Sequence, residues 1–103
     1  MPDTILVTGF LRLDPSHRDA AVSAATTLMA ACRAEDGVER YDYSADLEDT
    51  GVIYINEQYR DQAAMDAHMA SPALATFMAE AGGFGISEVS LTKWDGATAS
   101  KLM

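Results

Sequence analysis

The chain has 103 residues, which is the length of one small domain. Hydrophobic residues make up 49% of it and charged residues 22%, as is usual for a globular protein. Seven Lys and Arg against 16 Asp and Glu give a net charge of -9, and such a field repels a phosphate backbone. We therefore expect a single domain over residues 1–103, with 96–103 as a flexible tail, and no nucleic-acid partner.

Cysteine usage and hydropathy indicate a cytoplasmic protein. Cys32 is the single cysteine, so it has no partner for an internal disulfide. The first residues, Met1 to Thr4, lack the basic and apolar regions of a signal peptide. No apolar run approaches the roughly 20 residues that cross a bilayer. A reducing cytoplasm, without a membrane partner, fits these features.

The first half of the chain predicts a strand followed by a long helix. Residues 4–13 are apolar and rich in β-branched side chains, which is typical of a strand. Asp14 is a good N-cap and Pro15 suits the first helical position, so we expect a helix over residues 15–35 that stops at Gly37. Its apolar stripe has helical spacing and consists of Ala21, Ala25, Leu28, Met29 and Cys32.

The second half predicts a hairpin, an interrupted helix and a last strand. Residues 38–47 and 52–59 have strand composition, and the turn-rich residues 48–51 between them make an antiparallel hairpin. Asp61 can cap a second helix that runs to about Ala70. Ser71-Pro72 repeats the signal of a cap and a first helical residue, so this helix breaks and restarts to about Ala81. Residues 84–94 form the last predicted strand.

The element order β-α-β-β-α-β predicts an α+β, ferredoxin-like fold. Two right-handed crossovers around one hairpin give a four-stranded antiparallel sheet with both helices on one face. The first strand is nevertheless apolar on both faces, because Leu6 and Phe10 oppose Ile5 and Val7. A bare apolar sheet face of this size exceeds what monomers usually expose. A homodimer that covers the second face is therefore predicted.

Residues 56–71 carry the most specific pattern in the chain. Glu57-x-Tyr59 ends the third strand, and Ala64-x-x-x-His68-x-x-Ser71 follows on the next helix. This pattern resembles the antibiotic biosynthesis monooxygenase family, in the dimeric α+β barrel superfamily, and the length and element order also match as far as Trp94. Members include cofactor-independent quinol and anthrone monooxygenases, haem-degrading monooxygenases and proteins without an established substrate. The resemblance implies a pocket between the helices and the sheet.

His68 is the predicted catalytic residue. An imidazole among apolar helix neighbours such as Met65 could remove a phenolic proton near neutral pH, and the resulting anion could pass an electron to O₂. Tyr59, Glu57 and Met65 are predicted to bind the substrate, with Tyr59 as an aromatic wall. Glu57 could orient His68, bind a substrate hydroxyl or form a salt bridge. The alternative is a structural histidine that is hydrogen-bonded to a group such as Glu57.

Other polar and aromatic residues have structural explanations. Gly9 lies inside a strand and indicates a close approach of backbone or ligand. Arg12 fits a surface role, and Cys32 fits a small core residue with no recognisable histidine partner. Two histidines and one cysteine give no metal-ligand spacing, so neither a metal nor another cofactor is predicted. The remaining aromatic residues could stack on a planar aromatic substrate, but core or interface packing is their commoner role; they are Tyr41, Tyr43, Tyr54 and Trp94.

Three functions remain open at this point. The first is a cofactor-independent monooxygenase that oxidises a quinol, an anthrone or a related polycyclic phenol, so that its partners are a small aromatic substrate and O₂. The second is a non-catalytic small-molecule-binding or stress-related dimeric module. The third is haem degradation, which is disfavoured: the family's haem degraders carry an axial histidine near the place of Met78, and no histidine follows His68.

Overall fold

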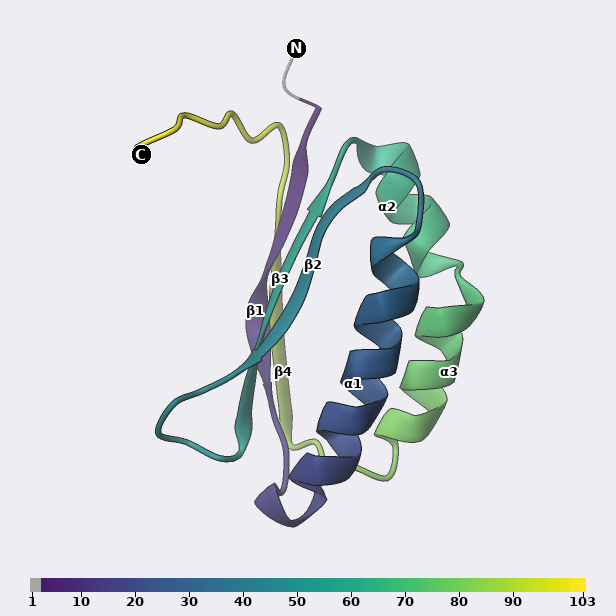
Figure 1. The fold of residues 1–103 in the computed structure, drawn as a ribbon, viewed down its shortest axis with the longest axis vertical. Helices are drawn as coiled ribbons and strands as arrows, with labels where there is room; N and C mark the ends of the chain where they lie inside the picture. The colour runs from purple at the N-terminus through teal and green to yellow at the C-terminus, as the bar shows by residue number, and fades with distance from the viewer. Residues whose placement is uncertain (1–2) are drawn as a thin grey trace.

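The computed structural model describes residues 3–103 and has two layers, a sheet and a layer of helices (Figure 1). The four strands are β1 (Ile5–Arg12), β2 (Val38–Ala45), β3 (Val52–Tyr59) and β4 (Glu88–Trp94). They pair antiparallel in the order β2-β3-β1-β4. A 3-10 turn (Pro15–His17) leads into α1 (Arg18–Arg33), and α2 (Gln62–Met69) and α3 (Pro72–Ala81) follow β3. The predicted ferredoxin-like fold is confirmed.

The helix starts are fixed by the side chains that the sequence indicated. The Asp14 carboxylate accepts a hydrogen bond from the amide of Ser16 at 3.0 Å. Asp61 accepts from the amide of Ala64 at 2.9 Å and caps α2. Ser71 caps α3 at its own first turn, with Pro72 as the first helical residue. The predicted break between α2 and α3 is therefore correct.

The predicted start of the last strand is wrong. We expected a strand from Phe84, but β4 begins at Glu88. Phe84 is buried in the core instead, where its ring packs edge-on against Phe77 with centroids 6.2 Å apart. Gly85 follows with φ +65°, a conformation that a strand residue does not adopt. Phe84 and Ile86 therefore pack a turn against the core rather than form part of a strand.

The β1–β4 pairing requires a glycine at position 9. A Cβ atom on Gly9 would lie 1.8 Å from the carbonyl oxygen of Ser90 on β4. The two strand backbones therefore approach each other more closely than any other residue at this position would allow. The close approach that the sequence indicated is one of backbone to backbone.

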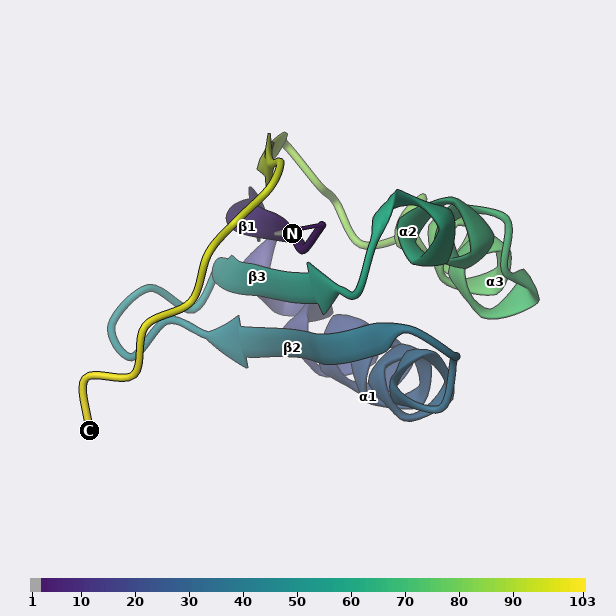
Figure 2. The same cartoon turned by 90° about the horizontal axis from the view of Figure 1, so that it is seen from above.

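The helices cover the sheet unevenly. Figure 2 shows the helices on one side of the sheet and β4 at the edge opposite β2. Every residue of β4 is exposed, including Leu91, which pairs with β1 on the helix side. On the other face, Phe10 is half-buried while Tyr54 and Trp94 are exposed. No helix within residues 3–103 is both long and apolar enough to cross a membrane.

Candidate active site

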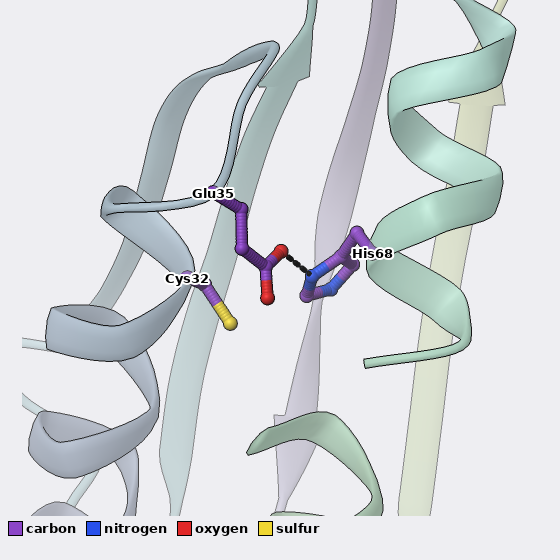
Figure 3. A group of neighbouring side chains, drawn as sticks. All are labelled: Cys32, Glu35 and His68. Carbon is purple, nitrogen blue, oxygen red and sulfur yellow. Dashed lines mark hydrogen bonds and ion pairs between the residues drawn. The ribbon is translucent and has the colours of Figure 1, made fainter. Parts of the chain in front are cut away.

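His68 lies in the last turn of α2 with only 2% of its surface exposed. Its Nδ1 atom is 2.9 Å from Oε1 of Glu35, which follows the end of α1 (Figure 3). A carboxylate accepts hydrogen bonds and donates none, so Nδ1 carries the proton in the neutral imidazole. Nε2 then holds the free lone pair. Glu35 thus fixes the tautomer that a general base requires.

Glu57 and Tyr59 form a second buried pair beside this histidine. The Tyr59 hydroxyl donates a hydrogen bond to Oε1 of Glu57. Burial raises the pKa of the Glu57 carboxyl, while the Tyr59 hydrogen bond and the charge of His68 act in the opposite direction. Burial also raises the pKa of Tyr59, so its hydroxyl stays protonated and remains a donor. Glu57 is not the hydrogen-bond partner of His68, a role that Glu35 takes.

Two tyrosines of β2 form an aromatic wall. The ring of Tyr41 lies 4.9 Å from that of His68 in an edge-on arrangement. Tyr43 stacks on Tyr41 with centroids 5.5 Å apart, and their hydroxyls are 3.3 Å apart. Burial raises the pKa of Tyr43 to about 12, so it stays protonated at neutral pH. Packing against Tyr41 and the hydrogen bond with Glu35 together hold the His68 ring in one orientation.

An apolar cavity of about 290 Å³ opens at this group of side chains. His68, Glu57 and Lys93 are its polar lining residues. Its aromatic and apolar lining comes from α2, α3 and the strands β1, β2 and β4, and comprises Val7, Tyr41, Tyr43, Met65, Met69, Leu74, Met78 and Leu91. A few convergent polar groups in an apolar cavity are the usual pattern of a small-molecule site.

His68 also lines a second, more open cavity of about 590 Å³. It runs between α2 and the turn after α1, and its lining includes Glu35, Asp36, Arg60 and three alanines of α2. We place the candidate active site in the smaller cavity, because Glu57 and both β2 tyrosines line only that one. His68 lines both cavities, so a molecule bound in either one would contact this residue.

The structure brings together three of the four predicted site residues. His68, Glu57 and Met65 line the 290 Å³ cavity. Tyr59 is fully buried behind it, with its ring 5.6 Å from that of His68, and does not line it. The sequence offered Tyr41 as a stacking residue but favoured core packing for it, whereas its side chain lines the cavity. The hairpin register, which pairs Tyr41 with Glu57 on the same face, was the signal that could have found it.

Cys32 has a histidine nearby, contrary to the expectation from the sequence. Its side chain is fully buried near the end of α1 and points toward the Glu35–His68 pair (Figure 3). The ligand atoms of Cys32, Glu35 and His68 all lie within 4.8 Å of one another. The spacing of cysteine and histidine alone could not reveal this group, because Glu35 completes it. Burial raises the pKa of the Cys32 thiol to about 11.

The chain is similar in sequence to a known protein family. A model of the antibiotic biosynthesis monooxygenase family matches residues 4–80, which include both His68 and Glu57. The chain belongs to this family. No curated protein matches the sequence.

Solved structures with the fold of this family align over almost the whole chain. A proposed antibiotic biosynthesis monooxygenase from Deinococcus radiodurans is 23% identical, with a TM-score of 0.87, and the match covers 96% of this chain and 98% of that one. A second, from Caulobacter crescentus, is 18% identical at a TM-score of 0.87, covering 94% and 92%. A conserved protein from Bacteroides thetaiotaomicron, of unknown function and described as a possible oxidoreductase, is 23% identical at 0.82, covering 92% and 99%. These similarities establish the fold.

Proposed function

We propose that this protein is a cofactor-independent monooxygenase that oxidises an anthrone, a quinol or a related polycyclic phenol with O₂. The observation that carries this proposal is the Glu35–His68 pair, buried beside an apolar cavity of about 290 Å³. Membership of the antibiotic biosynthesis monooxygenase family supports the same general reaction.

The proposed reaction begins when Nε2 of His68 accepts a proton from the substrate. Glu35 stabilises the imidazolium that forms, as a carboxylate partner does for a histidine base. The substrate anion passes one electron to O₂, and the two radicals combine to form a C–O bond. The O–O bond then breaks: one oxygen atom becomes the new carbonyl, and the other leaves as water with the two hydrogens of the oxidised carbon. Oxidation of the CH₂ carbon of an anthrone to C=O releases four electrons, which reduce both oxygen atoms of O₂, so no further reductant is needed.

The lining of the cavity suits a planar aromatic molecule. Its volume lies at the small end of ligand cavities, which are about 300–1,000 Å³, so a compact ring system is favoured over a long chain. Tyr41 and Tyr43 offer aromatic faces for stacking. Lys93 lies at the edge of the cavity on β4, where its ammonium group is paired with Asp95 at 2.8 Å. This cation can attract the developing substrate anion.

We also propose that the protein works as a cytoplasmic homodimer. Leu6, Phe10, Tyr54 and Trp94 gather on the sheet face turned away from the helices, through the Leu6–Trp94 and Phe10–Tyr54 strand pairs. A second copy that packs against this face would remove the patch from water. The same contact would also hold β4, and with it the open edge of the cavity, in place.

Oxygen consumption tests the proposed reaction. Purified protein is mixed with anthrone or with menadiol in air-saturated buffer, with and without added flavin and with chelator. We expect oxygen uptake without added flavin and also in the presence of chelator. One O₂ should be consumed for each anthraquinone formed from anthrone. Tight binding of anthrone without oxygen uptake would show a binding module instead, and the proposed reaction would be wrong.

A further inference from the structure

Three side chains of different chemistry converge beside the candidate active site. Cys32 and Glu35 come from the end of α1 and its following turn, and His68 comes from α2 (Figure 3). Their thiol, carboxylate and imidazole ligand atoms lie within 4.8 Å of one another. We propose that these residues form a binding site for a thiophilic divalent cation such as Zn²⁺, and that the bound cation inhibits the enzyme by withdrawing His68 from its role as base.

The distances are close to those of a zinc site. Zinc binds sulfur at about 2.3 Å and nitrogen or oxygen at about 2.0–2.2 Å, so tetrahedral ligand atoms lie about 3.3–3.6 Å apart. The Nδ1–Oε1 distance of 2.9 Å is shorter than this, and the widest separation in the group is no more than 4.8 Å. Ligand shifts of about 1 Å or less therefore complete the geometry. Glu35 is the least buried of the three and has the freedom to make this adjustment.

The charges favour zinc over the common hard cations. A thiolate and a carboxylate together carry two negative charges, which neutralise one divalent cation in a buried site, and the imidazole adds none. Sulfur and imidazole ligands suit Zn²⁺, whereas Mg²⁺ and Ca²⁺ prefer oxygen alone. Three protein ligands leave the fourth tetrahedral position for water. A mixed set of one Cys, one Glu and one His fits this description.

The open cavity of about 590 Å³ provides an entry path. Glu35 and His68 both line it, and Asp36 places a further carboxylate beside Glu35. A hydrated cation can therefore reach two of the three ligands from solvent without entering the apolar cavity. The substrate and the cation would approach His68 through different cavities.

Occupation of this site changes the protonation of His68. Zinc takes the lone pair of Nδ1, so the ring proton moves to Nε2, and the Cys32 thiol releases its proton to solvent as the sulfur–zinc bond forms. Nε2 is then a hydrogen-bond donor rather than a base. The inhibition, though not the binding, rests on the proposed function of His68.

Binding can be measured without any substrate. Zinc is titrated into the protein in competition with a chromophoric chelator, and cobalt is added separately as a spectroscopic probe. We expect one zinc per chain with a dissociation constant of about 1 μM or tighter. Cobalt should produce a thiolate charge-transfer band in the near ultraviolet. Cys32→Ala, Glu35→Gln and His68→Gln should each weaken zinc binding at least about tenfold.

Two matched variants serve as controls. His17→Gln removes the other histidine, and Glu48→Gln removes an exposed carboxylate in the hairpin turn; both should leave zinc binding unchanged. Thermal unfolding shows whether each variant is folded. Should Cys32→Ala fail to fold, the cobalt band of the wild-type protein and the Glu35→Gln titration still decide the question. A wild-type dissociation constant above about 100 μM, or equal affinity in folded Cys32→Ala, would overturn the proposed site.

Oxygen uptake tests the inhibitory part separately. Zinc should inhibit the wild-type protein and the His17→Gln variant at concentrations near the dissociation constant. Cys32→Ala, compared with its own rate without zinc, should need at least about ten times more zinc for half inhibition. Zinc binding without inhibition would show that the site exists but that the proposed inhibition is wrong. If no preparation consumes oxygen, the proposed function fails, and the chelator titration alone decides whether the site exists.

Discussion

The two sides of the apolar cavity differ in how firmly the chain holds them. Its inner wall consists of Tyr41, Glu57 and His68, which are 1%, 9% and 2% exposed. Its outer rim includes Met78 and Leu91, which are 64% and 50% exposed. The difference arises because the helices pack over β2, β3 and β1 but leave β4 uncovered (Figure 2).

This contrast separates the chemistry of the site from its closure. Each polar side chain of the inner wall has a partner within the chain: Glu35 for His68, Tyr59 for Glu57 and Tyr43 for Tyr41. The rim has large apolar side chains that remain in water, and a bound substrate would cover them. Substitutions in the wall should therefore change the rate of reaction, and substitutions in the rim should change substrate affinity.

The largest effect is expected at His68. His68→Ala should lower the rate of oxygen uptake by about 10²–10⁴-fold, because general base catalysis contributes about that much. His68→Gln keeps the size and hydrogen bonding and should be nearly as inactive. As the rim control, Met78→Ala should raise KM and leave kcat within about tenfold. A purely structural histidine would behave in the opposite way: Ala would destabilise by about 1–3 kcal/mol through an unpaired partner, and Gln would restore activity.

The next effect concerns the attachment of β4 to the sheet. Gly9→Ala should destabilise the protein by about 3 kcal/mol, because its Cβ would overlap the Ser90 carbonyl and separate β1 from β4. Gly82→Ala is the matched control: its nearest atom would be 3.7 Å from the new Cβ and its φ is helical, so stability should change by less than about 1 kcal/mol. Urea unfolding measures both. If Gly9→Ala were as stable as Gly82→Ala, β4 would be able to shift away from β1 at little cost.

The fold could be predicted from the sequence because local and global signals agree. Asp61, Ser71 and Pro72 mark helix starts by chemistry that acts within three residues. The burial of β1 and β3 largely alternates along each strand. The start of β4 could not be predicted in this way. Apolar residues at Phe84 and Ile86 look the same in a strand and in a turn that packs into the core.

The site was only partly predictable, for a similar reason. His68 was recognisable because Ala64-x-x-x-His68-x-x-Ser71 on one helix resembles the family pattern. Its partner Glu35 lies 33 residues earlier, and only the packing of α2 beside the end of α1 brings the two together. Tyr59 lies on the predicted face of β3, but it packs with Ile5 and Ala64 in a core cluster below the cavity. The alternation of residues along β3 predicts which face Tyr59 is on, but it does not predict how deeply the helices bury that residue.

A smaller effect is expected from the outer sheet face. The wild-type protein should have twice the 11.0 kDa chain mass in light scattering at micromolar concentration, with an interface above about 1,000 Å². Phe10→Glu adds a charge to this face and should weaken the dimer by at least about tenfold. Leu91→Glu adds the same charge to the helix side of β4 and should leave the dimer intact. A wild-type mass of 11 kDa would refute the dimer, and dissociation by Leu91→Glu alone would place the contact on the helical side.

The smallest effect is a pH dependence of stability that Glu57 contributes from the inner wall. Burial raises the pKa of Glu57 above its ordinary value of 4.5, so the folded protein keeps a proton that the unfolded chain has already lost. Stability should therefore fall as pH rises from 4.5 through the folded pKa, and this contribution should be constant above it.

Glu57→Gln removes the titrating group and should remove this decline, because the amide oxygen can still accept the hydrogen bond from Tyr59. Glu48→Gln, in the exposed hairpin turn, is the control and should follow the wild-type curve. Urea unfolding at one protein concentration between pH 4.5 and 7.5 measures all three, since a dimer would make stability depend on concentration. Parallel curves for the wild-type protein and Glu57→Gln would mean that Glu57 titrates alike in the folded and unfolded states, and that water reaches the inner wall as freely as it reaches the rim.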